Sequence, residues 1–172
     1  AEANAILMEV LEDSTQEPMV RHEAAEALGA IGSAEALSTL EKYLKDPTVE
    51  VAETCELALA RIKWLEISES KATSLKSPYN SVDPAPPATT SSISDLKTIL
   101  LDEKQPLFER YRAMFSLRNI ATNEAILALG AGLKCGSSAL FKHEIAFVLG
   151  QIQDENSVEF LKESLEDCNE NE

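Results

Sequence analysis

Aromatic residues are scarce in this 172-residue chain and make up only 5% of it, although 44% of its residues are apolar. Alanine and leucine therefore carry most of the apolar content, as in proteins built from stacked short helices. The length suits one ordinary domain or two small ones, with enough apolar residues for a core. Because no run of 18 apolar residues occurs and no signal peptide is evident, we expect neither a membrane span nor secretion.

Basic residues are also few, since 15 Lys and Arg face 30 Asp and Glu and give a net charge of −15. This charge disfavours nucleic acid and favours a cationic partner or substrate. Acidity that serves only solubility explains the charge at least as well. The three cysteines (Cys55, Cys135 and Cys168) are an odd number without metal-type spacing, which predicts reduced thiols in a cytoplasmic protein.

The chain has only two histidines, and each lies in a copy of the same short stretch. His22 is preceded by a base and followed by Glu23, and His143 is likewise followed by Glu144. On an α-helix each copy places its apolar residues on one narrow stripe: Ala24, Ala27, Leu28 and Ile31, then Ile145, Val148, Leu149 and Ile152. The histidines then project roughly 160° and the glutamates roughly 100° from the stripe centres. This geometry predicts histidines that point away from the core, towards a ligand.

The apolar pattern of each histidine stretch recurs once more in the sequence, at a spacing of 31 or 32 residues. Val51, Cys55, Ala58, Leu59 and Ile62 repeat the first pattern, and Arg110, Ala113, Ser116, Leu117 and Ile120 precede the second. In these flanking copies Glu53 and Tyr111 occupy the histidine position. Such a period, with two short helices per unit, is the signature of an α-solenoid and resembles short HEAT-like repeats.

The segment 68–92 differs in composition from the rest, since it holds four of the seven prolines and many serines. It is predicted to be a flexible linker, with Tyr79 to Pro84 able to lie against a domain surface. The fold prediction is therefore an all-α, HEAT-like helical-repeat solenoid in two pseudo-symmetric halves, 1–67 and 93–172. Within the first half we expect Glu17-Pro18 to break the first helix, with the His-Glu helix following it. Gly29 and Gly32 should end that helix or thin its packing surface, and Ser33 should cap the next one.

A single adjacent His-Glu pair cannot close a metal site, because its side chains point about 100° apart. Two such helices facing each other could supply imidazole and carboxylate together, the ligand set of non-haem iron and of di-iron sites. Polar surface on a helical repeat is the competing interpretation, and the residues alone leave both open. Neither a phosphate loop, a Gly-x-Ser-x-Gly elbow nor a His-Glu-x-x-His helix occurs. Cys55 and Trp64 are interpreted as core residues.

Four stretches carry a closer resemblance: Gln16–Gly32, Glu50–Cys55, Ser81–Pro87 and Pro106–Phe115. With them the chain resembles the deoxyhypusine hydroxylase (deoxyhypusine monooxygenase) family of HEAT-repeat di-iron enzymes over essentially its whole length. That family has four His-Glu motifs, and the two found here resemble the second and the third. The resemblance implies the central part of a longer enzyme, with the first motif before Ala1 and the fourth after Glu172. Each iron would then lack one histidine, unless self-association or a companion fragment supplies it.

The resemblance also implies roles for the site residues. His22 and Glu23 would ligate one iron, His143 would ligate the other, and Glu144 would serve that second site as a ligand or by binding the substrate amine. Two irons and O2 would convert deoxyhypusine to hypusine on eukaryotic translation initiation factor 5A. The alternatives are a non-catalytic HEAT scaffold that binds a partner protein on its concave face, and a different metal hydrolase on the same repeats.

Overall fold

The computed structural model describes residues 2–68, 78–168 and 170, and all regular elements in these ranges are helical, which confirms the all-α prediction. The elements are α1 (Glu2–Glu12), α2 (Pro18–Ile31), η1 (Ala34–Ala36), α3 (Leu37–Lys42), α4 (Val49–Ser68), α5 (Ile93–Leu101), α6 (Leu107–Ile120), α7 (Asn123–Gly132), α8 (Ala139–Ile152), η2 (Glu155–Ser157) and α9 (Val158–Glu166). Within the described ranges, no helix combines the length and apolar character needed to cross a membrane. The chain divides into two compact units, 1–86 and 87–172.

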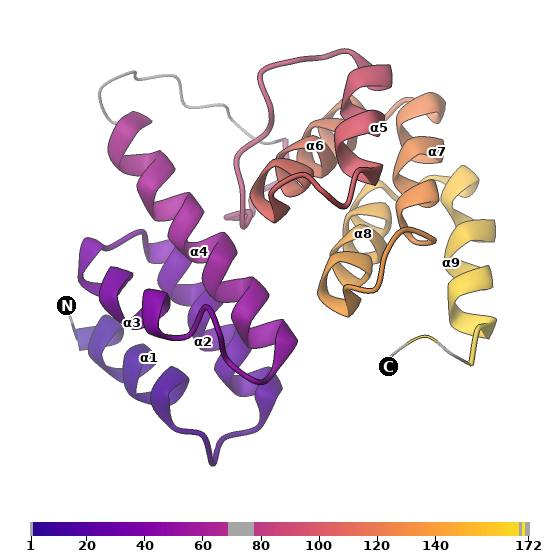
Figure 1. Ribbon diagram of the computed structural model, residues 1–172. Coiled ribbons are helices and arrows are strands. Elements are labelled where there is room, and N and C mark those ends of the chain that lie inside the picture. Colours follow the sequence, from indigo (N-terminus) through magenta and orange to yellow (C-terminus); the bar gives the residue numbers. More distant parts are fainter. Residues whose placement is uncertain (1, 69–77, 169, 171–172) are drawn as a thin grey trace. The chain divides into compact units, whose positions relative to one another are not determined.

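The first unit consists of α1 to α4, with α2 packed against both α1 and α4 (Figure 1). Pro18 opens α2 at a position where its missing N–H costs nothing. Gly32 ends the helix in the left-handed region, with φ 75°, and its N–H donates to the Leu28 carbonyl. Ser33 caps the following turn as predicted, since its hydroxyl accepts the Glu35 N–H. Local sequence signals therefore place both ends of the helix that carries the first histidine.

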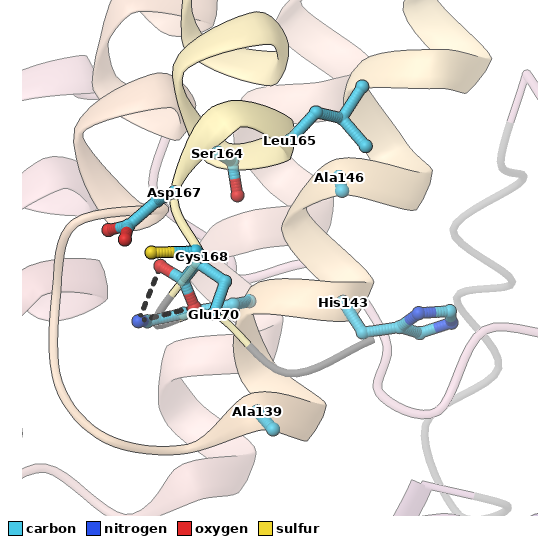
Figure 2. Close-up of a pocket in the computed structure, with 9 residues that line it drawn as sticks. Ala139, His143, Ala146, Ser164, Leu165, Asp167, Cys168 and Glu170 are labelled. Carbon is cyan, nitrogen blue, oxygen red and sulfur yellow. Dashed lines mark hydrogen bonds and ion pairs between the residues drawn. The ribbon is translucent and has the colours of Figure 1, made fainter.

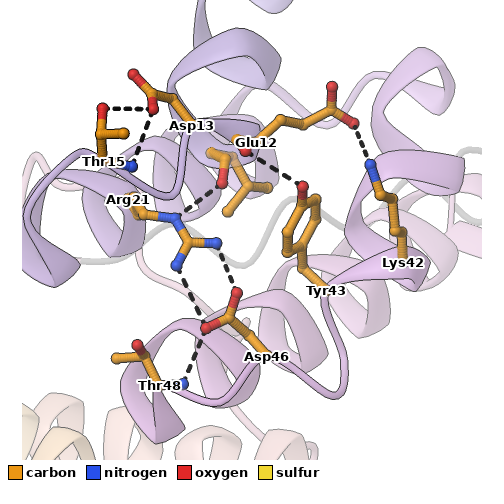
Figure 3. A network of polar contacts seen from close by, with 9 residues as sticks. Glu12, Asp13, Thr15, Arg21, Lys42, Tyr43, Asp46 and Thr48 are labelled. Carbon is orange, nitrogen blue, oxygen red and sulfur yellow. Dashed lines mark hydrogen bonds and ion pairs between the residues drawn. The ribbon is translucent and has the colours of Figure 1, made fainter.

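A buried ion pair joins α2 to the segment before α4 (Figure 3). Arg21 on α2 donates Nε–H to the Leu11 carbonyl at 3.0 Å, and its Nη2 lies 2.5 Å from Asp46 Oδ2. The two side chains are only 6% and 3% exposed. The Asp46 carboxylate also accepts the Thr48 N–H, and the guanidinium lies 5.5 Å from the Tyr43 ring centre. Every charged group in this pair therefore has hydrogen-bond partners, which burial requires.

The second unit, α5 to α9, uses an arginine in the equivalent place. Arg110 on α6 donates Nε–H to the Leu100 carbonyl at 2.9 Å, ten residues back, as Arg21 does to Leu11. Its second partner, 25 residues ahead, is the Cys135 thiol rather than a carboxylate. The guanidinium stacks over the Phe141 ring, 3.9 Å from its centre. The repeat thus extends beyond the apolar pattern to a shared structural arginine.

The predicted apolar stripe of α2 is partly wrong. Ala24 and Leu28 are buried, but Ile31 is 50% exposed, and Arg21 and Ala25 are buried instead. A helix packed between two neighbours, here α1 and α4, buries a wider and differently centred face than one stripe predicts. In α4, by contrast, all five predicted positions are buried, among them Cys55. Cys55 is fully buried, which confirms the prediction that it serves packing, and this burial raises the pKa of its thiol to about 12.

Residues 69–77 of the predicted linker lie outside the described residues, and the boundary between the two units, at Pro86 and Pro87, falls inside it. Asp83 accepts a hydrogen bond from Arg61 Nε at its carbonyl, and Ala85 is fully buried. Ala88, in the second unit, donates its N–H to the Arg112 carbonyl. Within this segment, Asp83, Ala85 and Ala88 are therefore held against the helices.

Two glycines at equivalent positions, each seven residues after a histidine, should respond to alanine in opposite ways. A Cβ on Gly29 would lie 2.8 Å from Ala58 Cβ, whereas one on Gly150 would meet no atom of the described chain within 4 Å. We expect Gly29→Ala to lower the free energy of unfolding by roughly 1–3 kcal/mol through overpacking of α2 on α4. Gly150→Ala should raise it by roughly 0.5–1 kcal/mol through helix propensity. Urea denaturation measures both, and equal effects would show that α2 and α4 are not in close contact.

Candidate metal centre

His22 is buried between α2 and α4, and only 7% of it is exposed. The prediction that it points away from the core was wrong, because the helix of the next repeat covers the face that a single helix would leave open. Its Nδ1 lies 2.7 Å from Thr54 Oγ1 on α4. The Thr54 hydroxyl in turn donates to the Glu50 carbonyl at 2.7 Å. The first histidine is thus held from one side by the neighbouring helix.

Two carboxylates lie near the other nitrogen of this imidazole. His22 Nε2 is 3.9 Å from Glu23 Oε1 and 4.0 Å from Glu26 Oε2, and the glutamate side chains are 66% and 41% exposed. The structure therefore brings the predicted pair, His22 and Glu23, within reach of a common point. Glu26 was missed by the sequence analysis, although a spacing of four residues from His22 places it on the same helix face. This end of α2 combines a buried ring with solvent-accessible carboxylates.

The chemistry of this donor set fits a divalent transition metal. Imidazole nitrogen and carboxylate oxygen are the ligands of non-haem iron, and of zinc and manganese as well. A metal ion held by His22 and Glu23 would need a slight approach of their side chains, which the exposed glutamate permits. Across the residues that the structure describes, no three His, Cys, Asp or Glu side chains already converge closely enough to hold an ion by themselves. The first unit therefore presents a partial ligand set.

His143 occupies the corresponding place on α8 but is exposed. It lines a cavity of about 600 Å³ together with Lys142, Ala146 and residues of α9 and the tail that follows it. Figure 2 shows its imidazole directed away from the Asp167 and Glu170 carboxylates. Lys142 Nζ is occupied by Glu170, whose two oxygens lie 2.8 and 2.9 Å away. The second histidine is thus accessible to a ligand, and the base before it anchors the tail.

The predicted site residues therefore differ in how the structure holds them. His22 and Glu23 belong to the first unit and His143 and Glu144 to the second, so each unit supplies one motif. Glu144 is half-buried on α8. His22 is fixed by Thr54, a residue that sequence reasoning did not single out. Its signals in the sequence were its place in the stretch Glu50–Cys55 and its position after Glu53, which replaces histidine in the next repeat.

Comparisons with known proteins agree with this architecture. The family of HEAT repeats matches residues 1–60, and the PBS lyase HEAT-like repeat matches 109–135 and 141–167. The deoxyhypusine hydroxylase of Drosophila pseudoobscura pseudoobscura is 61% identical over 97% of this chain and 55% of its own length. The human deoxyhypusine hydroxylase is 55% identical over 99% of this chain and 56% of its own length.

A solved structure is also similar. The structure of human deoxyhypusine hydroxylase in complex with glycerol has a TM-score of 0.91, with 55% identity, and the match covers 99% of this chain and 58% of that one. The chain thus spans about half the length of the curated relatives it matches.

Proposed function

Because the chain belongs to the deoxyhypusine hydroxylase family, we propose that it supplies part of an O2-dependent di-iron enzyme. This enzyme would hydroxylate deoxyhypusine to hypusine on eukaryotic translation initiation factor 5A. The observation that carries the proposal is the arrangement at His22: a buried imidazole fixed at Nδ1 by Thr54, with its Nε2 directed towards the Glu23 and Glu26 carboxylates. A merely solvated histidine on a repeat surface would need no such support.

In this proposal His22 and Glu23 hold one iron, and His143 holds the other. When bound, the two irons would activate dioxygen, so that one oxygen atom enters a C–H bond of the substrate and the other leaves as water with two electrons from a reductant. The chain itself contributes the ligand orientation. The first imidazole is buried and locked, whereas the second borders an open cavity. The open side is the better candidate for access by a long side chain.

The substrate side chain carries amines that are cationic at neutral pH, which suits a chain with a net charge of −15. Lys142, the cation adjacent to His143, is paired with Glu170. That pairing reduces repulsion between Lys142 and an approaching ammonium group. We assign Glu144, the carboxylate next to His143, to the second site, where it binds an amine of the substrate or ligates the metal.

Glu144→Ala should separate these two roles. The substitution is made in a chimera in which this chain replaces the matching segment of human deoxyhypusine hydroxylase. If Glu144 binds the amine, the variant chimera should have a KM for the deoxyhypusine-bearing protein about tenfold or more above that of the unsubstituted chimera, because a charge-assisted contact is lost. Its iron content should remain that of the wild type. Glu124→Ala, on the exposed surface of α7, is the matched control and should change neither quantity. Equal losses of iron and of substrate binding would instead make Glu144 a ligand.

The whole proposal can be tested in a chimera in which this chain replaces the matching segment of human deoxyhypusine hydroxylase. The 55% identity and TM-score of 0.91 make such an exchange structurally reasonable. The chimera should add the mass of one oxygen atom to a deoxyhypusine-bearing substrate, and only in the presence of O2. A chimera that folds without iron, and that loses no function or stability in His22→Ala, would favour the HEAT scaffold. Metal-dependent activity without O2 would favour a hydrolase.

A further inference from the structure

The Thr54 hydroxyl makes two hydrogen bonds, and it can donate its single proton in only one of them. Its Oγ1 is 2.7 Å from His22 Nδ1 and 2.7 Å from the Glu50 carbonyl oxygen. The carbonyl can only accept a hydrogen bond, so the single hydroxyl proton must be donated to it. If the proton pointed at His22 instead, the hydroxyl lone pairs would face the carbonyl lone pairs at 2.7 Å. That arrangement is repulsive, and the side chain is only 3% exposed, so little water is available to relieve it.

This constraint determines which nitrogen of the His22 imidazole carries the proton. With its own proton committed to Glu50, Thr54 Oγ1 is an acceptor towards His22, and Nδ1 must carry the hydrogen. In the neutral ring Nε2 then bears the lone pair. That nitrogen is the one near Glu23 and Glu26, at 3.9 and 4.0 Å. Two carboxylates alone would favour the opposite tautomer, with a hydrogen on Nε2. Thr54 therefore favours the tautomer that the two carboxylates disfavour.

We infer that Thr54 is a positioning residue that holds His22 in its Nδ1–H tautomer and fixes the ring plane, leaving Nε2 ready to bind a metal ion. This inference rests on the proposed function for the identity of the metal. The tautomer itself rests only on the two hydrogen bonds. Ligating histidines commonly donate their other N–H to a carbonyl or a carboxylate; here a threonine hydroxyl relays that bond to a helix carbonyl.

The repeat explains where this support comes from. Thr54 is the position in α4 that corresponds to Glu23 in α2, 31 residues earlier, and it follows Glu53, which replaces the histidine. A repeat that lacks a His-Glu pair at this position therefore supports the pair of its neighbour. The Thr54 hydroxyl reaches the carbonyl four residues back, as a threonine in a helix commonly does. No extra loop is needed to place it.

Nitrogen-15 labelling of histidine tests the tautomer directly in the metal-free chain, which has only two imidazoles. At alkaline pH, where imidazoles are neutral, long-range correlation spectra distinguish the two tautomers. His22 should show the Nδ1–H pattern in the wild type and in Thr54→Ser. It should shift towards the Nε2–H pattern in Thr54→Val, which keeps the shape and removes the hydroxyl. The His143 signal is the internal reference and should not move.

Thr98→Val is the matched control, because the Thr98 hydroxyl on α5 also donates to the carbonyl four residues back, that of Ser94, but has no histidine beside it. Its spectrum should match the wild type. An Nε2–H pattern for wild-type His22, or no change in Thr54→Val when circular dichroism shows an intact fold, would overturn the inference.

Ferrous iron binding provides a second readout in the chimera described above. Thr54→Val should weaken iron affinity about 10–100-fold, and Thr54→Ser should largely restore it. An unchanged affinity in Thr54→Val would overturn the positioning role. If neither the wild type nor any variant binds iron while the tautomer shifts as expected, the proposed di-iron function fails and the hydrogen-bond assignment stands.

Discussion

Replacing His22 with alanine should reduce hydroxylation by the chimera more than about 100-fold, beyond the loss typical of an outer-shell partner. The reason is that His22 is the imidazole donor of the first unit's candidate site and is already fixed in position by Thr54. Mass spectrometry of the deoxyhypusine-bearing substrate measures the product. Iron content should fall in the same variant, because the carboxylates of Glu23 and Glu26 cannot by themselves replace a locked nitrogen donor.

Because His22 is buried, the variant also needs a control for stability. His22→Gln keeps a polar side chain that can reach Thr54 but offers a poorer ligand. Both variants should retain wild-type circular dichroism and lose activity together. A folded His22→Ala chimera that keeps its hydroxylation rate would remove His22 from the metal site and leave it as a buried structural residue.

Asp46→Ala should be among the most destabilising substitutions in the first unit. The change leaves the Arg21 guanidinium buried without its counter-charge, and breaking such a pair costs about 3–5 kcal/mol. Denaturation in urea should show this loss at neutral pH. The matched control is Glu12→Ala, which breaks an exposed ion pair with Lys42 and should cost less than about 1 kcal/mol. Similar costs for the two variants would show that the Arg21 pair is not desolvated in solution.

The Arg21–Asp46 pair also predicts that the free energy of unfolding falls at acid pH. Burial alone raises the pKa of Asp46, but the hydrogen bonds from Arg21 and Thr48 outweigh it and lower the pKa below its ordinary value. A lowered folded pKa means that the stabilisation is complete above the unfolded pKa, near 4, and is lost as pH falls through the folded value. The Asp46→Ala variant should therefore lose less stability than the wild type between neutral pH and pH values below about 4.

The periodic pattern predicted much of the fold, since apolar spacing depends on local helix geometry. Pro18 and Gly32 mark the ends of α2, and the buried positions of α4 follow the 31-residue repeat. The burial of His22 could not be read in this way. Whether a helix face is covered depends on the next helix of the stack. The sequence of one helix alone predicts that every polar face is exposed to solvent.

The same limit applies to the polar partners. Arg21 and Asp46 are 25 residues apart, and Thr54 lies 32 residues from His22. Such pairs depend on how two helices are rotated about their axes, which hydrophobic spacing defines only coarsely. Glu26 was within reach of sequence reasoning, because four residues separate it from His22 on one helix. It was missed because only the adjacent His-Glu pair was considered as a ligand set.

The most direct test of the account is the iron content of the purified chimera, determined together with its protein concentration. We expect two irons per chain, falling to one in His22→Ala and to one in His143→Ala, with the fold of each variant intact. That outcome would show that each unit of this chain contributes its histidine to a separate iron. A folded double variant that retains both irons would contradict the account, because neither motif would then be part of the metal centre.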